Sequence, residues 1–70
     1  MKYEIGDRVT VNDRGMKTNN FNGEVIGIEP NTDVPVYNIN VEMRDKENKL
    51  TGKFRMINFL EHQLTKVVNV

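Results

Sequence analysis

Three short segments, each entered from a turn and rich in β-branched side chains, constrain most strongly what this chain can fold into. They are residues 6–11, 22–28 and 36–43. Such runs, bounded by Gly, Asn, Asp and Pro, are typical of strands. Residues 59–67 read as one helical turn that leads into a last short strand. Four or five short strands in 70 residues predict one domain over residues 1–70, an all-β, five-stranded barrel.

Alternation within these segments predicts which side chains form the core. In residues 36–43 the apolar side chains occupy every second position, which predicts one buried face. After a hairpin tip at residues 45–49, we expect Leu50, Phe54 and Met56 to share an inward parity. The predicted core contains Val9, Val11, Val25, Tyr37, Ile39, Val41, Phe54, Met56 and Leu64.

The connections carry signals of their own. Residues 12–23 are dense in Asn, Asp and Gly and predict a loop longer than a hairpin needs. Broken alternation beside Gly27 predicts a β-bulge. Asn58 is the expected N-cap of a short 3-10 turn over residues 59–63. Residues 65–68 are then expected to pair with the first strand.

Composition limits the class of function. Ten basic and ten acidic side chains give zero net charge, which argues against holding polyanions by bulk electrostatics. The absence of Cys and of an apolar signal segment favours a cytoplasmic protein, and no apolar run is long enough to span a membrane. We expect a monomer without a membrane partner.

Residues for catalysis are missing from the sequence. The chain has one histidine, His62, with no cysteine and no serine. A nucleophile–base pair needs a nucleophilic side chain beside its base, and a zinc site needs several His, Cys or carboxylate ligands close together. No Gly-rich loop leads into a helix, so a phosphate cradle is not expected. The sequence therefore predicts a protein that is not an enzyme and that holds no metal and no cofactor.

Two segments are candidates for binding. The first is the long loop, where apolar side chains with basic neighbours suggest a partner contact: Arg14, Met16, Lys17 and Phe21. Its alternative is that Phe21 covers the open barrel end while Met16 is only exposed. The second candidate is basic and would serve nucleic acid or electrostatic steering. It is an expected row of outward-facing side chains on the third and fourth strands with the hairpin tip between them: Arg44, Lys46, Lys49, Lys53 and Arg55. Its alternative is a set of ordinary solvated strand edges.

The motifs resemble a known family. Gly-Asp-x-Val-x-Val at residues 6–11, Gly-x-Val-Ile-x-Ile at 23–28, Tyr-x-Ile-x-Val at 37–41 and Leu64 after the turn are similar to SH3-like small barrels, especially KOW-type and phage-encoded bacterial members. The resemblance covers about residues 5–67. It implies a barrel that binds other macromolecules. KOW segments usually carry two close glycines in a basic loop, whereas this chain has only Gly23 and Lys17 there, which speaks against RNA.

These observations lead to one expected function and two alternatives. We expect a binding module, namely a small phage- or prophage-type accessory protein that binds and modulates a bacterial host protein. The first alternative is a KOW-like module associated with nucleic acid, the ribosome or transcription, with weak and salt-sensitive nucleic-acid binding. The second is a small structural subunit of a larger enzyme.

Overall fold

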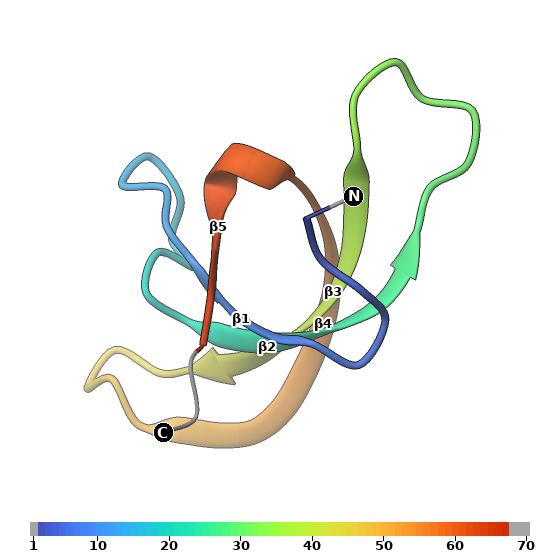
Figure 1. The fold of residues 1–70 in the computed structure, drawn as a ribbon. Coiled ribbons are helices and arrows are strands. Elements are labelled where there is room, and N and C mark those ends of the chain that lie inside the picture. Colours follow the sequence, from blue (N-terminus) through green and yellow to red (C-terminus); the bar gives the residue numbers. More distant parts are fainter. Residues whose placement is uncertain (1, 68–70) are drawn as a thin grey trace.

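The fold is a single antiparallel sheet with a short 3-10 helix near its end (Figure 1). The computed structural model describes residues 2–67. Its elements in chain order are β1 (Arg8–Val11), β2 (Asn22–Ile28), β3 (Val36–Arg44), β4 (Leu50–Leu60), η1 (Glu61–Gln63) and β5 (Leu64–Lys66). This confirms the predicted all-β class, the five strands and the 3-10 turn before the last strand.

The strands follow the order β4-β3-β2-β1-β5, so β4 and β5 are the two ends of the sheet. The sheet is strongly curved, and η1 leads from β4 to β5 (Figure 1). Within residues 2–67 no backbone pairing joins these two end strands, and closure into a barrel stays a prediction. No helix in the same range is long and apolar enough to cross a membrane.

Strand pairing explains two of the glycines in β2. The register between β2 and β3 shifts between Val25 and Gly27, which confirms the predicted bulge. At Gly23, an added Cβ would lie 2.7 Å from Cγ2 of Ile39 and 2.8 Å from the carbonyl oxygen of Asn40. Only glycine fits this close approach of β2 to β3.

Most of the predicted core is buried. The confirmed members are Val9, Val11, Val25, Tyr37, Ile39, Val41 and Leu64. Phe59 is buried with them. The prediction was wrong for Phe54 and Met56, each of which is 60% exposed. The inward direction expected of Leu50 is also wrong, since this side chain is 56% exposed.

The register between β3 and β4 explains this error. It pairs Tyr37 with Phe59, and directly opposite residues point to the same side of a sheet. The inner face of β4 therefore carries Phe59 and, two residues earlier, Ile57. Phe54 and Met56 lie on the outer face. Apolar residues occupy both parities of this strand, so alternation within β4 could not identify the buried side.

Tyr3 is a core residue outside any strand. Its ring packs edge-on against that of Tyr37, with centroids 5.3 Å apart. Its hydroxyl donates a 3.0 Å hydrogen bond to the carbonyl oxygen of Leu64, and its backbone N–H donates to the Tyr37 hydroxyl at 3.3 Å. The N-terminal segment thus covers the core between β3 and β5.

The short helix η1 begins later in the chain than predicted, whereas the pairing of β5 agrees with the prediction. The N-cap of η1 is Leu60 and not Asn58, and the backbone N–H of Leu60 donates to Oε1 of Gln63 at 2.8 Å. β5 pairs with β1, matching Thr10 with Thr65, as predicted. Val68, which that prediction also included, lies outside the described residues.

Candidate functional site

The connection between β1 and β2, residues 12–21, is an ordered loop. It closes where the backbone N–H of Asn20 donates to the carbonyl oxygen of Val11 at 2.8 Å. Inside the loop, Oδ1 of Asp13 accepts a 2.9 Å hydrogen bond from the N–H of Gly15. Asn20 adopts a positive φ of 71°, a conformation that asparagine tolerates well. We call residues 12–21 the first loop.

The four predicted contact residues of the first loop divide into two pairs. Met16 and Phe21 are half-buried and pack against the core, whereas Arg14 and Lys17 are exposed. The position of Phe21 agrees with the alternative that it covers the end of the core. Met16 is packed too, although that alternative left it exposed. Arg14 and Lys17 are thus the two exposed side chains of the four.

The side chain of Gln63 connects η1 to the first loop. Its Nε2 donates to Oδ2 of Asp13 at 2.8 Å and lies 3.8 Å from Sδ of Met16. The hydrogen bond from Gln63 lowers the pKa of Asp13, helped by the N–H of Gly15 and by the nearby charge of His62. A lowered pKa keeps this carboxylate ionised as an acceptor.

A groove of about 580 Å³ lies on another side of η1. We call it the η1 groove, and it is lined by Lys2, Val34, Pro35, Leu60, Glu61 and His62. Val34 is 55% exposed. The Tyr37 hydroxyl donates to Oε2 of Glu61 at 3.2 Å, which positions this carboxylate in the wall.

Sequence reasoning missed this groove. Val34 and Pro35 belong to the turn before β3, which the sequence marks by its two prolines and by Asn31 and Asp33. Leu60 and Glu61 reach the same place from the far end of β4. The one available signal was an apolar Val-Pro pair in a turn that is otherwise polar.

The first loop and the η1 groove lie on the same side of the molecule, and η1 contributes to both. In Figure 1 the first loop, η1 and residues 29–35 lie in the upper part of the view, and the hairpin of residues 45–49 lies at the lower left. The Gln63 contacts connect the first two directly. The two predicted regions are therefore separate surfaces, and the groove extends only the first of them.

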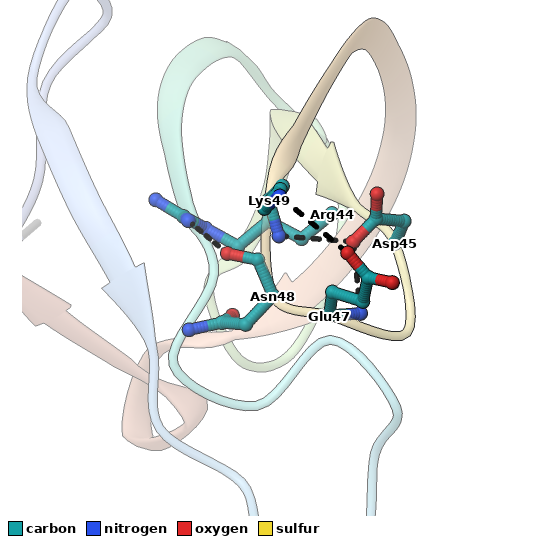
Figure 2. Close-up of polar contacts among 5 residues, drawn as sticks. All are labelled: Arg44, Asp45, Glu47, Asn48 and Lys49. Atoms are coloured by element: carbon teal, nitrogen blue, oxygen red, sulfur yellow. Dashed lines mark hydrogen bonds and ion pairs between the residues drawn. The ribbon is translucent and has the colours of Figure 1, made fainter.

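In the hairpin of residues 45–49, charged side chains interact with other groups of the same hairpin (Figure 2). Oδ1 of Asp45 accepts hydrogen bonds from the backbone N–H groups of Glu47 and Lys49 at 2.9 and 3.0 Å. One guanidinium nitrogen of Arg44 donates to the carbonyl oxygen of Asn48 at 2.8 Å, and Nζ of Lys49 is 3.5 Å from a carboxylate oxygen of Glu47. Two of the predicted cations thus have partners within the hairpin.

The remaining basic residues do not form the expected row. Lys46 is exposed at the tip. Arg55 lies opposite the buried Val41, so it belongs to the core-facing side of β4, where the strand runs past the core. By alternation Lys53 lies on that side as well. The sequence had placed both on the outer face, as the counterpart of an inward Phe54, and the register reverses this.

The described part of the chain, residues 2–67, contains no group of three or more His, Asp or Glu side chains placed to hold a metal ion. Two buried side-chain oxygens among these residues, Oγ1 of Thr18 and Oδ1 of Asn38, have no hydrogen-bond partner. Comparison with protein-family models, with curated proteins and with solved structures finds no match to this chain.

Proposed function

We propose that this chain is an SH3-like module that binds another protein and carries out no catalysis. The fold proposal is supported by five antiparallel strands, a 3-10 turn before β5, and the pairing of β5 with β1. The observation that carries the function is the η1 groove, held beside a loop that hydrogen bonds keep in place. An ordered groove binds a partner with less loss of conformational entropy than a mobile loop would.

The composition of the η1 groove suits a protein partner. Its apolar part comes from Val34, Pro35 and Leu60, and charged or polar groups come from Lys2, Glu61 and His62. Protein interfaces combine an apolar centre with a polar rim. A volume of about 580 Å³ lies within the usual range of concave binding sites.

The first loop completes this proposed surface. Arg14 and Lys17 are exposed in this loop and would contact or steer an acidic part of the partner. Met16 and Phe21 pack against the core and would hold the loop in position. All four predicted residues keep a role, but only the two cations would touch the partner.

The finer proposal is a phage- or prophage-type accessory protein whose partner is a bacterial host protein. Its support is the resemblance described above and a content of ten asparagines, as expected from an AT-rich genome. A KOW-like nucleic-acid module has weaker support, because Arg44 and Lys49 are engaged within the hairpin. Acidic Asp45 and Glu47 also lie among the cations of that region.

A pull-down from bacterial lysate with matched variants tests the proposal. Val34→Asp places a charge in the apolar groove, and Arg14→Glu with Lys17→Glu reverses the exposed charges of the first loop. Lys46→Glu with Lys49→Glu makes the same change in net charge in the hairpin of residues 45–49. Each variant is first checked by thermal melting.

We expect one captured protein to be lost with Val34→Asp, reduced with the loop variant, and retained with the hairpin variant. Nuclease treatment should leave its capture unchanged. Loss with the hairpin variant alone, or loss after nuclease, would instead favour the nucleic-acid alternative.

A further inference from the structure

β4 is an end strand with an unusual surface. It is the longest strand of the sheet, Leu50–Leu60, and pairs only with β3 within residues 2–67. Leu50, Phe54 and Met56 are 56%, 60% and 60% exposed. A long end strand with exposed apolar side chains is a template for pairing with another chain unless something blocks it.

Hydrogen bonds show which backbone groups of β4 face away from the sheet. The N–H of Glu29 donates to the carbonyl oxygen of Val36 at 2.9 Å, so the backbone of Val36 is directed toward β2. Direction alternates along a strand, which turns the backbone of Val41 toward β4 and that of its partner Arg55 toward β3. The free N–H and C=O groups at the outer edge therefore belong to the alternate residues Phe54, Met56 and Asn58.

The side chains along this edge alternate in chemistry. Phe54 and Met56 lie on the outer face, and Lys53 and Arg55 lie on the other. Among residues 2–67, neither of these two cations has a carboxylate within 4.0 Å. Glu42, which lies opposite Phe54, is ion-paired with Arg8 on the outer face. The edge thus presents apolar groups on one side and unneutralised positive charge on the other.

We propose that β4 binds an extended acidic segment of a partner protein, which adds to the sheet as a sixth strand. Its backbone would pair with the free groups of Phe54, Met56 and Asn58, as in other cases of strand addition. Residues opposite each other share a face, so the segment needs apolar residues beside Phe54 and Met56. It needs acidic residues at the alternate positions, beside Lys53 and Arg55.

The same charges disfavour a second copy of this chain as the occupant. We consider the two antiparallel registers that set Phe54 opposite the Phe54 or the Met56 of another β4. The first register places Lys53 opposite Arg55, and the second places Arg55 opposite Arg55. Like charges directly opposite each other destabilise strand pairing. An acidic segment has the opposite effect, and this site is independent of the η1 groove.

A titration with short peptides tests the proposal. The probe is a capped peptide of alternating glutamate and valine, added to the ¹⁵N-labelled protein at low salt, and the control peptide replaces glutamate by lysine. We expect the amides of Phe54, Met56 and Asn58 to shift and to exchange more slowly with solvent. The amides of Val34 and His62 in the η1 groove should stay unchanged, and the control peptide should not bind.

Two variants test the electrostatic and backbone parts separately. Lys53→Glu with Arg55→Glu should weaken binding at least about tenfold, while Lys46→Glu with Lys49→Glu is the charge-matched control. Met56→Pro removes an outward N–H without removing a bond to β3, a position where proline is tolerated. It should fold and lose the peptide, whereas Arg55→Pro removes a bond to β3 and should unfold the protein.

Several outcomes would overturn the proposal. They are no binding of the acidic peptide, shifts confined to the η1 groove, equal binding by the charge-reversed variant or equal binding of the lysine peptide. Sedimentation of the free protein as a dimer that Met56→Pro dissociates would assign this edge to a second copy. If Met56→Pro does not fold, the charge-reversed pair and the amide shifts decide the result.

Discussion

Nε2 of Gln63 donates a 2.8 Å hydrogen bond to Oδ2 of Asp13, which lies 50 residues earlier in the chain. Oε1 of the same side chain accepts the backbone N–H of Leu60 at 2.8 Å. The two ends of one amide thus join the first loop to the turn that forms a wall of the η1 groove. This connection makes the two parts of the proposed surface interdependent.

A charge placed at this amide should release the first loop. Gln63→Glu keeps an oxygen for the N–H of Leu60 but sets a carboxylate against that of Asp13. We expect a lower melting temperature, and partial recovery when Asp13→Asn is added, because the repulsion is then removed. Urea unfolding of the parent, the two single variants and the double variant measures the coupling. Simple additivity of the two changes would contradict the contact.

Acid should weaken the same connection. Because the folded chain lowers the pKa of Asp13, ionised Asp13 stabilises the fold at pH above the ordinary aspartate pKa. This contribution is lost as the pH falls through the lower folded pKa. We therefore expect Asp13→Asn to be less stable than the parent at neutral pH and the difference to shrink in acid. Asp33→Asn, in the exposed turn before β3, is the charge-matched control, and an equal difference at all pH values would refute the assignment.

Alanine substitutions should separate the true core from the outer face of β4. Ile39 is fully buried, so Ile39→Ala should cost about 2–5 kcal/mol in the free energy of unfolding. Phe54→Ala and Met56→Ala remove side chains that are 60% exposed and should cost about 0.5 kcal/mol or less. Urea denaturation monitored by circular dichroism measures all three. A large loss at Phe54 would mean that it is buried in solution.

The Tyr3 hydroxyl should contribute measurably to stability. Tyr3→Phe keeps the ring against Tyr37 but removes the 3.0 Å bond to the carbonyl oxygen of Leu64. A buried polar group left without its partner costs about 1–3 kcal/mol. Thermal and urea unfolding should show this loss without a change of fold. Tyr37→Phe is the companion variant, since its hydroxyl contacts both Tyr3 and Glu61.

Local patterns in the sequence determined much of the sheet. The bounds of β2, the bulge beside Gly27 and the buried face of Tyr37, Ile39 and Val41 agree with prediction. In each case the signal lies within a few neighbouring residues, either as strict alternation or as its local failure at a glycine. The long first loop was visible in the same way, from its dense Asn, Asp and Gly.

Tertiary structure decided the facing of β4, the role of Tyr3 and the location of the η1 groove. β4 carries apolar side chains at both parities, and only its register against β3 shows that Phe59 faces inward while Phe54 faces solvent. Tyr3 is buried through contacts with Tyr37 and Leu64, which lie 34 and 61 residues away. The η1 groove likewise joins Lys2, Val34 and Leu60. Packing between segments so far apart leaves no periodic signal in any one of them, because each contact depends on how the whole sheet curves.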